Sequence, residues 1–153
     1  MKSWLEGGRQ CIKDEAEAVL GLIPQLDESF DKAVDIVLNS KGKLIVTGVG
    51  KSGHIGAKIA ATLSSTGTSS FFMNALDAYH GDLGMIATDD VVLAISYSGH
   101  TDELLRILPG ILSRGVPVIG MSGNPDSLLA RYSVVHLNAS VAREACPLGL
   151  APT

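Results

Sequence analysis

Cysteine is almost missing from this 153-residue sequence, which has only Cys11 and Cys146. Two cysteines so far apart provide neither a disulfide framework nor a cysteine-based zinc site, and this usage is typical of a reducing compartment. Positive charge is also in deficit, because 12 Lys and Arg oppose 16 Asp and Glu, for a formal net charge of −4. The sequence therefore offers no basic field for a nucleic acid, and any anionic ligand must be held locally.

Long apolar runs are absent as well. No stretch approaches the roughly 18 residues of a membrane span, and Glu6 and Asp14 interrupt the region where a signal peptide would need an apolar run. We therefore expect a cytoplasmic protein with no membrane partner. The 46% hydrophobic and 18% charged residues are typical of a soluble globular protein. We expect one domain over residues 1–153, with N-terminal helices within residues 1–40.

Hydrophobic periodicity predicts alternating strands and helices. The predicted helices are residues 9–38, divided at Pro24, and residues 52–65, 102–113 and 127–131; Pro109 is expected to kink or divide the third. The predicted strands are residues 43–47, 70–73, 91–96, 116–121 and 134–137. Strands that are apolar throughout and alternate with helices indicate a parallel sheet covered on both faces. The predicted fold is therefore a three-layer αβα sandwich around a five-stranded parallel sheet, of the flavodoxin or Rossmann-like kind.

A glycine-rich segment follows the first predicted strand. It reads GVGKSG from residue 48 and contains Gly50, Lys51 and Ser52. The pattern G-x-G-x-x-G between a strand and a helix is typical of a dinucleotide-binding site. However, such a site needs an acidic residue near the end of the second strand, which here ends at Asn74. The pattern is not that of a nucleotide-triphosphate loop, because Ile45 stands where the first glycine would be. Alternatively, the glycines only pack the helix on the sheet.

A second polar loop follows the third predicted strand. Residues 96–101 read SYSGHT and contain Ser96, Ser98, Gly99 and Thr101 immediately before a helix. Free N–H groups and the positive end of the helix dipole bind phosphate there without net positive charge. The alternative is that Thr101 simply caps the helix and the serines form a turn.

Two further polar segments follow strands. Residues 77–84 contain His80, and residues 143–147 contain Glu144. Neither segment has metal-ligand spacing. A lone histidine is more often structural than catalytic, and a lone glutamate is more often solvated. Their positions after strands make both residues candidates for a site at the carboxyl ends of the sheet.

The segments GVGKSGHIGAKIAATLSSTGTSSFF, YHGDLGM, AISYSGHTDEL and REACPLGLAPT occur in this order. Together they resemble the sugar isomerase (SIS) domain of arabinose-5-phosphate isomerases, from about Lys43 to Thr153. The resemblance implies a five-stranded αβα sandwich, a homotetramer, and interconversion of D-arabinose 5-phosphate and D-ribulose 5-phosphate for synthesis of the surface sugar acid Kdo.

Three departures from the resembled family are visible. Many relatives carry a C-terminal pair of CBS regulatory domains, which this sequence lacks, so we expect no regulation through them. Relatives continue beyond the position of Thr153 with a segment bearing a histidine thought to be catalytic, so we expect the site to be incomplete. The second polar loop has Tyr97 and His100 where relatives more usually read SNSGES.

The resemblance also implies roles for individual residues. The catalytic residues would be Lys51, His80, Glu103 and Glu144, and the substrate phosphate would bind at Gly50, Ser52, Ser96, Ser98, Gly99 and Thr101. An aldose–ketose isomerisation of this type requires no metal or organic cofactor. Two other classes stay open: a catalytically silent sugar-phosphate sensor, and an NAD-dependent oxidoreductase that rests on the glycine pattern alone. Which of Glu103 and Glu144 takes the carbon-bound proton is also left open.

Overall fold

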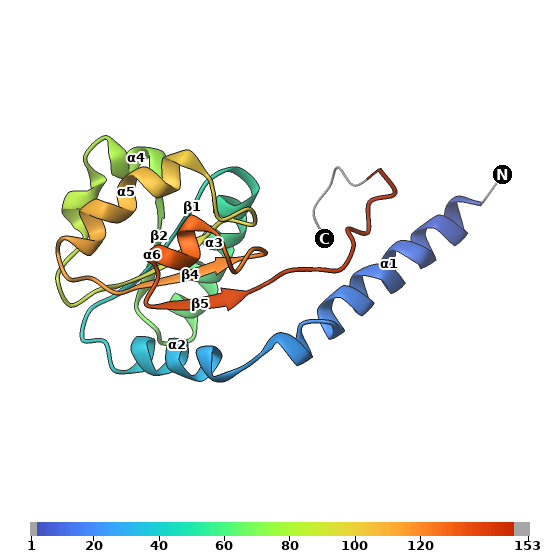
Figure 1. The fold of residues 1–153 in the computed structure, drawn as a ribbon, viewed down its shortest axis with the longest axis horizontal. Coiled ribbons are helices and arrows are strands. Elements are labelled where there is room, and N and C mark those ends of the chain that lie inside the picture. Colours follow the sequence, from blue (N-terminus) through green and yellow to red (C-terminus); the bar gives the residue numbers. More distant parts are fainter. Residues whose placement is uncertain (1–2, 149–153) are drawn as a thin grey trace.

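The computed structural model describes residues 3–148, in which a long N-terminal helix precedes alternating strands and helices (Figure 1). The helices are α1 (Trp4–Leu20), η1 (Ile23–Gln25), α2 (Glu28–Leu38), α3 (Gly50–Ser65), α4 (Ala75–Tyr79), η2 (Asp82–Met85), α5 (Asp102–Leu112) and α6 (Leu128–Tyr132). The strands are β1 (Leu44–Gly48), β2 (Ser70–Asn74), β3 (Val91–Ile95), β4 (Val118–Ser122) and β5 (Val135–Asn138).

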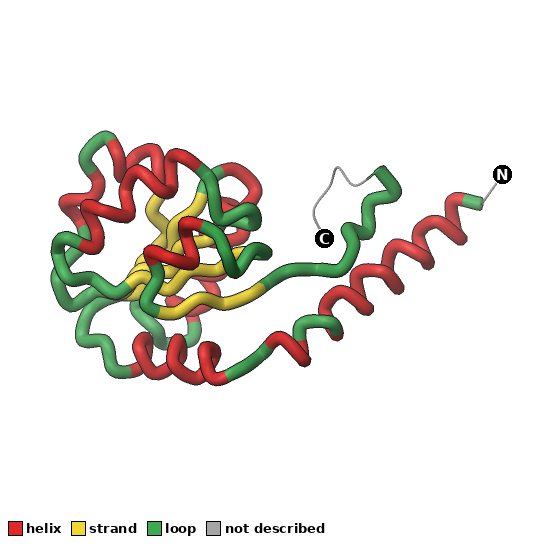
Figure 2. Tube along the Cα trace, in the orientation of Figure 1, coloured by secondary structure: helices red, strands yellow, loops and turns green. Residues whose placement is uncertain are grey.

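The five strands form a single parallel sheet in the order β2-β1-β3-β4-β5. Figure 2 shows the strands between two layers of helices. The predicted fold class is therefore confirmed. Gly48 at the end of β1 is in register with Asn74 on β2 and Ile95 on β3. The carboxyl ends of the strands thus lie along one edge of the domain.

Two apolar clusters hold the layers together. On one face of the sheet, Ala33 of α2 and Ala60 of α3 pack against Val46. On the other face, Ala78 of α4, Ile107 of α5, and Leu129 of α6 join a cluster built on β1, β3 and β4. Central strands β1 and β3 are buried along their whole length. Burial on both faces explains why these strands read as unbroken apolar runs rather than as alternating patterns.

Helix α1 contributes no buried residue to the domain. It leads away from the sheet, and the chain beyond β5 runs beside it (Figure 1). Arg143 of that segment forms an ion pair of 2.8 Å with Asp14 of α1. No helix among residues 3–148 combines the length and the apolar character needed to cross a membrane.

The helix predicted at residues 102–113 is confirmed as α5, and Pro109 lies inside this helix without dividing it. Two local expectations need correction. The strand predicted at residues 116–121 begins two residues later, at Val118. The short helices α4 and η2, which form the segment around His80, were not predicted. Pro24 does separate the N-terminal helices, since it lies within η1.

Candidate functional site

The site begins where the strand order reverses between β1 and β3. These strands are neighbours in the sheet, but α3, which follows β1, covers one face, and α5, which follows β3, covers the other. The chain therefore leaves the two strands in opposite directions. A crevice at such a point, beyond the carboxyl ends of the strands, is where open α/β sheets bind their ligands.

The two helices at this point differ from the other described α-helices at their N-termini. Ser3, Asp27, Asn74 and Ser127 cap α1, α2, α4 and α6 through side-chain hydrogen bonds. In contrast, α3 and α5 have no side-chain cap among the residues that the structure describes. The first N–H groups of a helix have no partner within the helix. Those of α3 and α5 are thus left for an anion or for water.

The loop of residues 96–101 is closed by its own hydroxyl groups. Ser96 Oγ lies 2.8 Å from Thr101 Oγ1 and accepts a hydrogen bond of 3.1 Å from Gly99 N. Ser98 Oγ accepts one of 3.2 Å from His100 N. Thr101 occupies the N-cap position of α5, but its hydroxyl contacts Ser96 instead of the helix. The alternative that Thr101 simply caps this helix is therefore wrong.

The glycines after β1 have different tasks. A Cβ atom on Gly53 would lie 3.1 Å from the Gly48 carbonyl oxygen, and one on Gly56 would lie 3.2 Å from Val46 Cγ1. These two glycines let α3 pack closely on the sheet. Gly50 instead has a φ of +58° and open space around it, so it serves the turn into α3. The packing alternative thus applies to Gly53 but does not account for Gly50.

The dinucleotide interpretation of this glycine pattern gains no support from β2. That strand ends at Asn74, whose side chain accepts a hydrogen bond of 3.0 Å from Leu76 N and caps α4. A dinucleotide site needs a carboxylate near this position to bind the ribose. Among the described residues, no group of three or more His, Cys, Asp or Glu side chains is arranged to hold a metal ion.

Lys51, Ser52 and Glu103 lie in the first turns of α3 and α5. Lys51 is exposed, whereas Ser52 and Glu103 are half-buried. The pairing of Gly48 with Ile95 brings the starts of these helices to the same edge of the sheet. The structure therefore groups these three predicted residues with loop 96–101.

His80 ends α4 and is exposed, with its ring at an edge-on angle to that of Tyr79. The segment that follows is held against α5 by Arg114, whose Nη1 donates to the carbonyl oxygens of Leu83 at 2.6 Å and Ile86 at 3.2 Å. Arg114 lies far from His80 in the sequence, and no sequence motif predicted that it holds the segment after His80.

Glu144 lies in the segment after β5, beside α1. It lines a hollow of about 500 Å³ together with Gln10, Asp14 and Arg143. No residue of loop 96–101 lines this hollow. Within this chain, Glu144 is therefore grouped with α1, whereas Glu103 is grouped with the loop.

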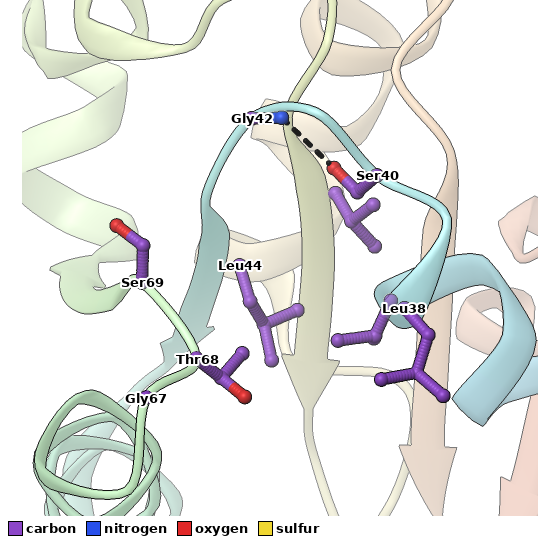
Figure 3. A pocket seen from close by; sticks show the side chains of 9 residues that line it. Leu38, Ser40, Gly42, Leu44, Gly67, Thr68 and Ser69 are labelled. Carbon is purple, nitrogen blue, oxygen red and sulfur yellow. Dashed lines mark hydrogen bonds between the residues drawn. The ribbon is translucent and has the colours of Figure 1, made fainter.

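Another hollow, of about 300 Å³, lies at the opposite ends of the strands (Figure 3). Its lining includes Leu38, Ser40, Gly42 and Thr68, and none of its lining residues is charged. Ser40 Oγ there accepts a hydrogen bond of 3.2 Å from Gly42 N. An uncharged hollow at the amino ends of the strands lacks the groups that the predicted chemistry requires.

Comparison with known proteins adds a second line of observation. Residues 37–153 match the SIS domain. The sequence is 51% identical over 150 residues to arabinose 5-phosphate isomerase KdsD of Pseudomonas aeruginosa, a match that covers 98% of this chain and 46% of that protein. The chain thus spans about half the length of the curated relative.

Solved structures agree on the fold. The protein c3406 of E. coli CFT073, in complex with arabinose 5-phosphate, has a TM-score of 0.90 and 41% identity, over 95% of this chain and 77% of that one. The sugar isomerase domain of the RpiR transcription factor from Sphaerobacter thermophilus has a TM-score of 0.75 at 21% identity, over 87% of this chain and 75% of that one. At that identity the second likeness shows the fold alone.

Proposed function

This chain belongs to the SIS domain family, and from that premise we propose that it interconverts D-arabinose 5-phosphate and D-ribulose 5-phosphate. The observation that carries the proposal is the pair of helix N-termini without side-chain caps, those of α3 and α5, beyond the carboxyl ends of the neighbouring strands β1 and β3. A sugar phosphate supplies the anion that such helix ends bind. The relatives named for arabinose 5-phosphate support this choice of sugar.

In this proposal, the phosphate end of the substrate binds at loop 96–101. The hydroxyl groups of Ser98 and Thr101 and the first N–H groups of α5 are its hydrogen-bond donors, and Ser96, which is 3% exposed, holds Thr101 in place through the bond between their hydroxyl groups. Gly50 and Ser52 at the start of α3 provide a second set of hydrogen-bond donors. The protein has a net charge of −4. The helix dipoles and the oriented hydrogen-bond donors must therefore attract the phosphate, as a patch of Lys and Arg side chains does in other proteins.

The reaction moves one proton between neighbouring carbons. A base takes the proton from carbon 2 of the aldose, and the electron pair forms an enediolate with carbon 1. The same proton, or one from water, is then added to carbon 1, while the proton on oxygen 2 passes to oxygen 1. We assign the carbon base to Glu144, the transfer between oxygens to His80 and Glu103, and stabilisation of the enediolate to Lys51.

The assignment of Glu144 follows from where loop 96–101 holds the phosphate. Glu103 immediately follows this loop, so its reach is tied to the phosphorylated end of a five-carbon chain. The base must act at the far end of that chain. Glu144 lies in a different segment, beside α1, and a neighbouring subunit could bring it to the distant carbons.

We further propose that the chain forms a homo-oligomer, a tetramer by analogy with its family. Leu5, Ile12 and Val19 recur every seven residues on α1, so they form one stripe, and each is more than 60% exposed. On α2, Phe30 and Val34 line an apolar hollow of about 330 Å³ next to α3. Apolar surface of this extent on a separate helix is typical of a contact between chains.

The place of the reaction in metabolism is part of the same proposal. Arabinose 5-phosphate made here would supply synthesis of the eight-carbon acid Kdo for surface polysaccharide, in the cytoplasm. No metal or organic cofactor enters the mechanism, because each step uses a side chain of the protein as acid, base or hydrogen-bond donor.

Proton NMR of the protein with arabinose 5-phosphate in deuterium oxide tests the proposal. We expect the signals of ribulose 5-phosphate to appear and deuterium to enter at carbon 2 of the recovered aldose. Activity only on a hexose 6-phosphate would contradict the substrate. Binding of the pentose phosphate without turnover would favour the sensor, and binding of NAD without either sugar would favour the oxidoreductase.

A further inference from the structure

Loop 96–101 rests on a second polar layer formed by the segment that follows β4. Gly123 N donates a hydrogen bond of 2.8 Å to the carbonyl oxygen of Tyr97, and Leu129 N donates one of 3.1 Å to that of Gly99. Both bonds join the segment after β4 to backbone carbonyl oxygens of the loop. The position of the loop therefore depends on how the segment of residues 122–129 is held.

Ser122 is the centre of this second layer and is 1% exposed. Its Oγ donates to the carbonyl oxygen of Asn124 at 3.0 Å, accepts from Asn124 N at 3.2 Å, and lies 2.8 Å from His136 Nε2. A hydroxyl has one hydrogen, and a carbonyl oxygen can only accept. With that hydrogen on Asn124 O, His136 is the donor to Ser122 through its Nε2–H.

The contact between this layer and the loop is direct. Gly99 has a φ of +65°, and a Cβ atom there would collide with the side chain of Ser127 and lie 3.3 Å from Ser122 Oγ. Ser127 is fully buried, and its Oγ is 3.4 Å from that of Ser122. Interiors this closely packed transmit displacements, so a shift of Ser122 must move Gly99 and the loop amides with it.

We propose that His136 is a positioning residue for phosphate binding, which acts through Ser122 on loop 96–101. The inference rests on the proposed function, because it presumes that this loop holds the substrate phosphate. His136 lies on β5, beside Gly120 of β4, and reaches Ser122 diagonally on the same face of the sheet. It is half-buried, and burial lowers the pKa of His136. The neutral ring at pH 7 therefore donates one hydrogen bond without adding charge behind the loop.

The test compares four variants by calorimetric titration with inorganic phosphate and by steady-state kinetics with arabinose 5-phosphate. His136→Leu removes the donor, and His136→Gln places an amide donor at a similar reach. Ser122→Ala removes the acceptor. Ser70→Ala is the matched control, because Ser70 Oγ also donates one half-buried bond, of 2.7 Å to Ala60 O, but at the other end of the sheet.

We expect His136→Leu to raise the Kd for inorganic phosphate and the KM for the sugar phosphate about threefold to tenfold, as loss of one hydrogen bond would. Ser122→Ala should raise both at least as much, because it also removes the two hydrogen bonds with Asn124. The value of kcat should change less than twofold, and His136→Gln should restore most of the affinity. The double variant His136→Leu/Ser122→Ala should bind no more weakly than the weaker single variant, because both act through one contact.

Two results would overturn the inference while leaving the proposed function intact. One is wild-type affinity for phosphate in Ser122→Ala and His136→Leu. The other is an equal loss in Ser70→Ala, which would indicate general destabilisation. If the wild-type protein binds neither inorganic phosphate nor arabinose 5-phosphate, the proposed function itself fails, and the inference fails with it.

Discussion

Ser96 and Thr101 stand at opposite ends of one loop, yet their hydroxyl oxygens are 2.8 Å apart. This contact joins the two ends of loop 96–101. Gly99 N also donates to Ser96 Oγ, so three positions of the loop meet at one side chain. A binding loop ordered in advance loses less conformational freedom when its ligand binds.

Ser98→Ala should weaken substrate binding more than it slows the bound complex. A phosphate remote from the reacting carbons is held equally in the ground state and the transition state, so its contacts affect KM rather than kcat. Loss of one charge-assisted hydrogen bond should cost about 1.5 to 3 kcal/mol. Steady-state kinetics measures the split, and a fall in kcat with an unchanged KM would contradict the assignment.

Gly99→Ala should disable the loop, and Gly115→Ala provides a matched control. Both glycines have a positive φ, +65° and +75°, so alanine meets a similar backbone penalty at each. Only at Gly99 would the new Cβ collide with Ser127, because nothing lies within 4 Å at Gly115. We expect both variants to lower the melting temperature, but only Gly99→Ala to lose phosphate affinity in a calorimetric titration. Equal affinities would indicate that the packing of Gly99 is not needed for binding.

Glu144→Gln and Glu103→Gln should both bind substrate, but only Glu144→Gln should lose exchange of the carbon-bound proton with deuterium oxide. Loss of a general base typically costs about 10²- to 10⁴-fold in rate. Proton NMR follows the exchange directly. If Glu103→Gln alone abolishes it, the two roles are reversed. If neither variant does, neither glutamate is the carbon base.

Stability should fall at mildly acidic pH in a way that depends on His136. Burial lowers the pKa of this imidazole below its ordinary value of 6.5. As pH falls below about 6.5, the unfolded chain takes up this proton before the folded protein does, so the proton favours unfolding. Urea unfolding between pH 7.5 and 5.5 should therefore show a steeper loss of midpoint for the wild type than for His136→Gln. Parallel curves would show that burial does not control this group.

The apolar stripe of α1 should control self-association. Replacing Ile12 and Val19 with glutamate puts charge on a surface that the proposal buries between chains. Light scattering should then show a smaller species than the wild type, with lower activity if neighbouring subunits complete the site. Lys13→Glu changes charge on another face of the same helix and should leave the mass unchanged. A fully active wild-type monomer would end the proposal.

The sequence predicted the parts of the fold that depend on local patterns. Strands β1 and β3 are buried on both faces, so each appears as a short apolar run that ends in small, polar residues. The loop that begins at Ser96 was likewise recognised from its small, polar residues between a strand and a helix. Five residues carry little periodicity, so α4 was not predicted, although α6, of the same length, was. Pro109 does not divide α5, whose buried side chains pack on the sheet and offset the loss of the one backbone hydrogen bond that proline removes.

Only the tertiary structure decided which distant residues become neighbours. The strand order placed the loops after β1 and β3 at one edge of the sheet and sent α3 and α5 to opposite faces. It also set His136 of β5 beside Ser122, and Ser127 behind Gly99. Ser122 and His136 are ordinary strand residues with no local signal. Caps and periodicity depend on residues a few positions apart, whereas a buried polar contact depends on strand register and on the packing of whole layers.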